Sequence, residues 1–171
     1  MRNIIKILSL SGLMIFLAFS TSSAQKIAHV DSDAVIPAMQ EYKTAKSQVE
    51  DYSKQLQNQL KAEEEKMMKY YQQVMTDAQS GKLSPQQQQE AEQKLQGMQQ
   101  ALQKKAMEAD QKLMEKETSL TKPLYDKFNS ALEKVAKENG YAYIFDKKLL
   151  LYSDGGIDAT AKIKAALGLG W

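Results

Sequence analysis

Few side chains in this sequence are of the types that carry out acid–base, nucleophilic or metal chemistry. The chain has one histidine, His29, and no cysteine. A catalytic triad needs a histidine beside a nucleophile and a carboxylate, and a zinc site needs several ligands of the same kind. The acidic run at residues 63–65 would spread around a helix axis, and the turn at residues 153–156 lacks the lysine of a phosphate loop. We therefore expect no enzyme activity, no metal and no cofactor.

The side chains with the most distinctive chemistry are methionines and tyrosines in the middle of the chain. Methionine is flexible and polarizable, so it can adapt to apolar partners of different shape. Neighbouring residues on a helix point about 100° apart, so at least one member of each adjacent pair, 67–68 and 70–71, is expected on the surface. Alternatively, Met67, Tyr71, Met98 and Met107 only fill a seam between two helices. The candidate binding residues are Met67, Met68, Tyr70, Tyr71, Met75, Met98, Met107 and Met114.

These side chains lie in residues 38–122, a stretch whose pattern predicts two long helices folded back on each other as a coiled-coil arm. Apolar or small residues recur three and four apart from Tyr42 to Leu56, as in a coiled-coil seam. The same spacing returns from Ala91 to Phe128. Each helix then has about 40 residues, or about 60 Å at the rise of an α-helix. An arm of this length and thinness must act through its surface, because it cannot enclose a catalytic core.

The predicted tip of the arm is residues 79–85. Gly81 can adopt the left-handed conformation that ends a helix. Ser84 can cap the returning helix, with Pro85 at its first position and Gln87 at the spacing of a capping box.

The segments on either side of the arm, residues 25–37 and 123–171, are expected to form a small α/β body. Three short strands are predicted, at residues 26–31, 141–145 and 149–152, from their apolar and alternating patterns. A sheet of three strands of this length has only marginal stability on its own. We therefore expect the chain to associate with copies of itself through this body.

Helix ends and breaks in the body follow from polar residues and prolines. Ser32 can cap a first helix, with Pro37 in its first turns, where a missing N–H costs least. Pro123 is expected to kink or break the returning helix. Asp158 can cap a last helix at residues 159–167.

Residues 1–24 have the features of a secretory signal peptide. Arg2 and Lys6 precede an apolar run at residues 7–19, and Ser22 and Ala24 stand at the small-residue positions before Gln25. The run is short for a membrane-spanning helix, so we expect cleavage and export.

Charge excludes some partners of the exported chain. The sequence has 23 basic and 21 acidic residues, and removal of Arg2 and Lys6 with the leader leaves 21 of each. A neutral chain lacks the electrostatic footprint of nucleic-acid binding. The arm also lacks the basic polar face of a helix that lies on membranes. The absence of cysteine excludes a disulfide framework.

The order of these segments resembles the Skp/OmpH family of periplasmic chaperones. The resemblance covers KIAHVDSDAVI, the hairpin, VAKENGYAYIFD, LLLYSDGG and DATAKIKAALG. It implies a mainly helical α+β protein that forms a trimer through a common β body. Three arms would enclose a cavity that holds unfolded outer-membrane proteins, its clients, without ATP. The body residues that it implies are Ile27, Val30, Tyr141, Tyr143, Ile144, Phe145, Leu149, Leu150 and Leu151.

The arm departs from this family in its charge. The best-known members have strongly basic arms and a proposed basic site for lipopolysaccharide. Here residues 61–116 mix acidic residues with nine lysines, and no arginine follows the leader. Arginine binds phosphate in a bidentate manner that lysine does not reproduce. Lipopolysaccharide or membrane contact is therefore not carried over to this chain.

A second hypothesis is a periplasmic adaptor that docks one folded partner through its hairpin. Adaptors of that type need further β domains beside the hairpin, whereas only a small set of strands is predicted here. Such an arm should also have a regular seam and no exposed methionine or tyrosine.

Overall fold

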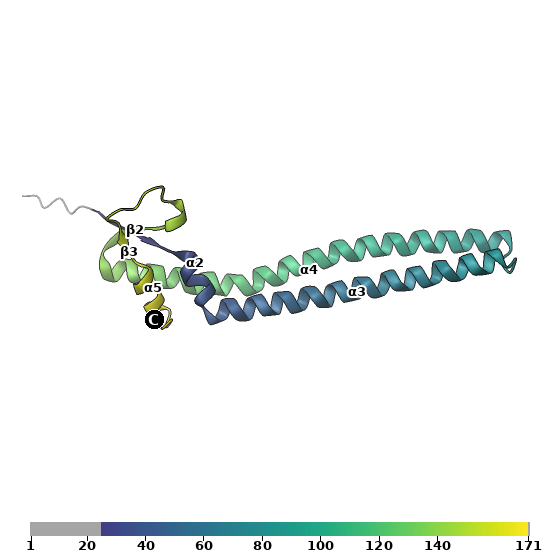
Figure 1. Cartoon of the computed structure of the whole chain (residues 1–171), viewed down its shortest axis with the longest axis horizontal. Coiled ribbons are helices and arrows are strands. Elements are labelled where there is room, and N and C mark those ends of the chain that lie inside the picture. Colours follow the sequence, from purple (N-terminus) through teal and green to yellow (C-terminus); the bar gives the residue numbers. More distant parts are fainter. Residues whose placement is uncertain (1–24, 171) are drawn as a thin grey trace, which may run out of the picture.

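The computed structural model describes residues 25–170 and shows a small body from which one long helical hairpin extends (Figure 1). The mainly helical α+β fold with an inserted hairpin is as predicted. The predicted signal peptide and Trp171 lie outside the described residues. The elements in chain order are β1 (Lys26–Val30), α2 (Ser32–Val35), η1 (Ile36–Ala38), α3 (Gln40–Gln79), α4 (Pro85–Asn139), β2 (Tyr141–Asp146), η2 (Lys147–Leu149), β3 (Ile157–Asp158) and α5 (Thr160–Ala166).

The tip of the hairpin has the predicted geometry. Helix α3 ends at its C-cap Ser80, and Gly81 follows with a φ of 68°. The Ser84 hydroxyl accepts a hydrogen bond from the Gln87 backbone N–H, and the Gln87 side chain accepts one from the Ser84 backbone N–H at 2.8 Å. Hydrogen bonds within the turn therefore satisfy backbone groups at the end of α3 and at the start of α4, which fixes where the chain reverses.

The predicted first helix is instead three segments. Asp31, and not Ser32, caps α2, because its side chain accepts a hydrogen bond from the Ala34 N–H at 2.9 Å. Pro37 then falls in the 3₁₀ turn η1, and Met39 is extended with a ψ of 135°. Ile36, the residue before the proline, keeps helical angles with a φ of -59° and a ψ of -48°. The interruption is at Met39, so the regular arm begins at Gln40.

The predicted break at Pro123 is wrong, since α4 runs through it from Pro85 to Asn139. Proline costs about 3 kcal/mol inside a helix. Leu124 and Phe128, one and five residues after the proline, are buried in the core of the body. Burial of two such side chains repays a cost of this size, so packing overrides the local preference.

The sheet is parallel, with strand order β2-β1-β3. Its third strand is wrongly placed by the sequence pattern. Residues 149–152 are not a strand; η2 closes when the Leu150 N–H bonds the Lys147 carbonyl at 3.1 Å. The second edge of β1 pairs instead with β3, and the Ala159 N–H bonds the His29 carbonyl at 2.8 Å. Residues 149–152 pair with neither outer edge of this sheet, so strand propensity alone does not make a strand.

The core lies between the inner face of the sheet and the last part of α4. Side chains of the two strand positions Ala28 and Val30 face α4, α5 and the segment that leads into the arm. The buried residues are Ala28, Val30, Val35, Met39, Leu124, Phe128, Ala131, Val135, Ala159 and Ile163. This cluster is the only extensive core within residues 25–170, and it fixes the base of the arm.

No helix within the described residues combines the length and apolar character needed to cross a membrane.

Candidate functional site

The two arm helices pack along a narrow seam made largely of small side chains. The buried positions in the arm are Ala45 and Leu56 of α3 and Ala91 and Ala109 of α4. Three of the four are alanines, so little large apolar surface is hidden between the helices. Apart from Leu56, the larger apolar side chains of the arm are half-buried or exposed.

The arm exposes methionine and tyrosine side chains along most of its length. Met107 and Met114 on α4 are 66% and 65% exposed, and Met68 on α3 is 53% exposed. Tyr71 and Met75 are also exposed. These five side chains are the candidate binding surface, hereafter the exposed arm residues.

The remaining candidates lie closer to the seam. Met67, Tyr70 and Met98 are half-buried, and the Lys94 ammonium lies 4.3 Å from the centre of the Tyr70 ring. Each adjacent pair thus has one exposed and one half-buried member. The seam interpretation is wrong for Tyr71 and Met107, which are exposed, whereas Met67 and Met98 lie partly in the seam.

Near the tip, the two helices form an open apolar hollow of about 470 Å³. Met67, Met68 and Tyr71 of α3 contribute thioether and aromatic surface. Leu95, Gln96 and Gln99 of α4 form the other wall. Such a lining offers both apolar contact and amide hydrogen-bonding groups to a bound chain.

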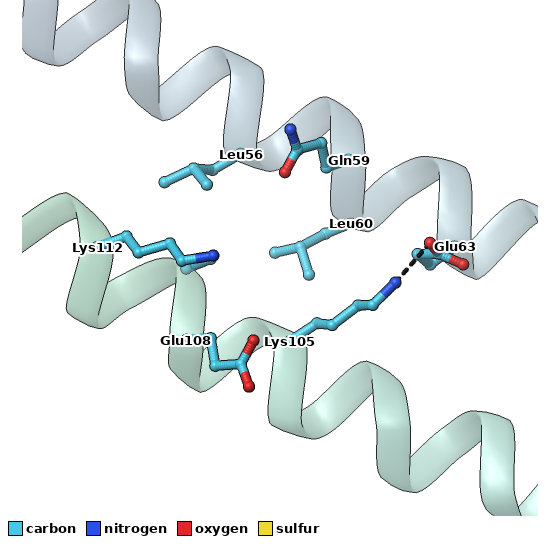
Figure 2. A pocket seen from close by; sticks show the side chains of 8 residues that line it. Leu56, Gln59, Leu60, Glu63, Lys105, Glu108 and Lys112 are labelled. Atoms are coloured by element: carbon cyan, nitrogen blue, oxygen red, sulfur yellow. Dashed lines mark hydrogen bonds and ion pairs between the residues drawn. The ribbon is translucent and has the colours of Figure 1, made fainter.

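Halfway along the arm, a second hollow of about 330 Å³ separates the helices. Figure 2 shows Leu56 and Leu60 directed into this space from α3, and the Lys105 side chain crossing it. The Lys105 ammonium lies 2.6 Å from a carboxylate oxygen of Glu63 and lowers the pKa of that carboxyl by hydrogen bonding. At this level a solvent-exposed ion pair joins the two helices beside the buried seam positions Leu56 and Ala109.

The sheet of the body has a second, exposed apolar face. Ile27 and Tyr143 are aligned across β1 and β2, and both are exposed together with Phe145. The rings of Tyr143 and Phe145 are stacked with their centroids 6.0 Å apart. We call Ile27, Tyr143 and Phe145 the outer face of the sheet.

The loop after η2 adds further uncovered apolar side chains. Leu151 is 106% exposed, and Leu149 and Tyr152 are also largely exposed. Sequence reasoning did not assign Tyr152 a role, although it continues the apolar run of the three leucines. The other body residues differ: Tyr141, Ile144 and Leu150 are half-buried, and Val30 lies in the chain's own core.

His29 is packed inside the body, in surroundings that indicate a structural role. It is 7% exposed, and its ring lies so close to Gly156 that a Cβ there would be 3.3 Å from Nδ1. Its Nε2 is 3.9 Å from an Asp158 carboxylate oxygen. Within residues 25–170, no group of three or more potential ligands converges as a metal site would require.

Comparison with known proteins identifies a family and a similar fold. A family model described as "Outer membrane protein (OmpH-like)" matches residues 26–167. The crystal structure of an OmpH-like protein from Caulobacter crescentus, named as a candidate outer membrane chaperone, superimposes with a TM-score of 0.71. The two sequences are 15% identical, and the match covers 85% of each chain. No curated protein gives a significant match to this sequence.

Proposed function

This chain belongs to the family of OmpH-like outer membrane proteins, and on that premise we propose that it is an ATP-independent holdase chaperone of the periplasm. It binds unfolded outer-membrane proteins and prevents their aggregation. It does so by contact alone, without catalysing a reaction.

The observation that carries this proposal is the distribution of apolar side chains over the arm. Folded monomeric proteins rarely leave large apolar side chains in repeated exposed positions without a partner. Here five such side chains are exposed on two helices whose seam hides little more than alanine. A holdase needs apolar surface that is free to contact another chain, and this arm provides it.

The chemistry of the surface suits partners without a fixed shape. Methionine side chains repack easily against different apolar groups, and tyrosine adds contact area with a polar end. Acidic and basic residues alternate around them, as in the pairs Lys104–Glu108 and Lys122–Asp126. Binding therefore depends on adaptable apolar contact more than on net positive charge.

The outer face of the sheet and the loop at residues 149–152 supply the proposed trimer contact. The isolated body leaves stacked aromatic rings and a fully exposed leucine in water, which is costly. Burying them against two further copies removes that cost. It also places three arms around one space, in which a client can be held.

The test is suppression of aggregation of a urea-unfolded outer-membrane β-barrel protein after dilution. We expect the variant Met68→Gln, Tyr71→Gln, Met75→Gln to need at least about threefold more chaperone for half-maximal suppression. A control variant, Glu64→Gln, Lys69→Gln, Gln72→Asn, alters exposed polar positions of the same stretch without changing net charge. It should act like the original protein.

Both variants should keep the helicity and oligomeric mass of the original protein, because none of the six positions lies in the seam or the body. Equal suppression by all three proteins would contradict the proposal. If mild crosslinking in an envelope extract instead captures one folded partner in stoichiometric amount, the adaptor hypothesis is favoured.

A further inference from the structure

Methionine exposure follows a graded order within the described chain. Of the seven methionines in residues 25–170, Met107 and Met114 are the most exposed, followed by Met68 and Met75. Met67 and Met98 are half-buried. Met39, in the core where the arm joins the body, is 1% exposed. An oxidant in solution therefore meets four thioethers of the arm first.

The four exposed methionines are also arranged in two matching pairs. Met68 and Met75 are seven residues apart on α3, as are Met107 and Met114 on α4. Seven residues are close to two helical turns, so each pair lies on one face of its helix. Each helix thus has a local stripe of accessible sulfur, and the two stripes lie at different levels of the arm.

We propose that these four methionines form a reversible oxidation site that regulates client binding. This inference rests on the proposed function, since it assigns regulation to the same surface. In the oxidised state the arm keeps its fold but loses most of its affinity for apolar segments. A thiol reductant, acting through methionine sulfoxide reductases, supplies two electrons and two protons to each sulfoxide, which gives back the thioether and one water and restores binding.

The oxidant is a peroxide, and the step is a two-electron transfer of oxygen. A lone pair of the methionine sulfur attacks one peroxide oxygen, the S–O bond forms and the O–O bond breaks. The departing hydroxide takes the proton of the hydroxyl group transferred to sulfur, so that hydrogen peroxide yields one sulfoxide and one water. Sulfur is oxidised and peroxide is reduced. With no cysteine in the sequence, no thiol of this chain competes for the oxidant.

The consequences for folding and for binding differ because of where the four side chains lie. A sulfoxide is polar and chiral, so it disrupts apolar contacts. Exposed sulfoxides remain in water in the unliganded arm, which costs the fold little. A client that packs against the same positions has to desolvate them. Binding is therefore weakened far more than stability.

The first measurement is the order of oxidation under limiting hydrogen peroxide, followed by peptide mass spectrometry. We expect sulfoxide at Met107 and Met114 first, then at Met68 and Met75, and at Met39 last. This result depends on accessibility alone and does not require that the protein be a chaperone. Early oxidation of Met39, or equal rates at all seven positions, would overturn the inference.

The second measurement is the affinity for a fluorescently labelled, urea-unfolded β-barrel protein before and after oxidation. We expect about tenfold weaker binding after oxidation, equivalent to about 1.4 kcal/mol. Treatment with methionine sulfoxide reductases of both epimer specificities should restore binding. Circular dichroism should show unchanged helix content throughout.

Leucine variants separate this mechanism from general oxidative damage. Met68→Leu, Met75→Leu, Met107→Leu, Met114→Leu preserves apolar volume and should bind the client equally well with and without peroxide. The control Met67→Leu, Met98→Leu should lose affinity on oxidation as the original protein does. Equal peroxide sensitivity of the four-leucine variant overturns the inference and leaves the holdase proposal standing. Absence of client binding by every reduced protein overturns the holdase proposal itself.

Discussion

The body and the arm of this molecule use apolar residues in opposite ways. In the body, ten buried residues close a core around β1 and the end of α4. The arm is much longer, but only four of its residues are buried between its two helices. These helices have 40 and 55 residues, and the second continues into the body. Five of the larger arm side chains, Met107 and Met114 among them, face water.

This difference shows how a small protein can be stable and still present a large apolar surface. The body and its proposed association provide the stability. Local devices then suffice in the arm: helical hydrogen bonds, a capped tip and surface ion pairs such as Lys105–Glu63. An apolar side chain on the arm is therefore free to serve binding instead of folding.

The largest expected contrast is between one core residue and one arm residue. Phe128→Ala removes a buried ring and should lower the free energy of unfolding by about 3–5 kcal/mol. Met107→Ala removes an exposed side chain and should change it by less than about 0.5 kcal/mol. Thermal and urea unfolding measure both. Similar losses for the two variants would abolish the distinction between body and arm.

The next effect concerns association through the outer face. Tyr143→Lys, Phe145→Lys places two charges where we propose a protomer contact. The penalty should exceed about 2 kcal/mol per protomer, enough to dissociate the proposed trimer at micromolar concentration. Sedimentation velocity measures the mass. The matched control is Tyr125→Lys, an exposed aromatic on α4, which should leave the mass unchanged; a lasting trimer in the double variant would refute the assigned interface.

A smaller and local effect is expected at the tip. Ser84→Ala removes the side-chain acceptor of the capping box and should cost about 1 kcal/mol of local helix stability. Hydrogen exchange should accelerate in the first turns of α4. Protection of β1 and of the end of α4 should not change, since the tip lies at the far end of the hairpin from the body (Figure 1). Faster exchange across the body would show that arm and body unfold together.

The smallest expected effect is the pH dependence of the body. A hydrogen bond from the Ser32 hydroxyl, and another from the Lys148 N–H, hold the pKa of Asp146 below its usual 3.8. The folded pKa is therefore lower than the unfolded one. The ionised carboxylate contributes stability above pH 3.8, and this contribution is lost as the pH falls through the folded pKa.

For this partly exposed group the contribution should be below about 1 kcal/mol. Urea unfolding between pH 6 and pH 2 should show a steeper loss for the original protein than for Asp146→Asn. Parallel curves would remove Asp146 from the account of the body's stability.

Sequence patterns predicted the arm well because its signals are local. The capping residues at Ser84 and Gln87 and the glycine at position 81 specify the turn without help from distant parts of the chain. Heptad spacing likewise specifies which faces of the helices meet. Which member of each adjacent pair is exposed was not predictable, because the rotation of each helix depends on how both pack.

The body was predicted less well because its elements depend on contacts distant in sequence. Residues 149–152 have strand propensity, yet β1 pairs with the two-residue β3, which is too short to give a sequence signal. Pro123 predicted a break that the burial of Leu124 and Phe128 overrides. In both cases tertiary packing determined the outcome.

The most direct test of the central claim is site-specific photocrosslinking to an unfolded β-barrel client. A photoreactive residue is placed at Met68 or Met107 on the arm, or at Lys134, an exposed position of α4 beside the core. We expect client crosslinks from both arm positions and few from Lys134. Crosslinks mainly from Lys134, with none from the arm, would contradict the claim that the arm holds the client.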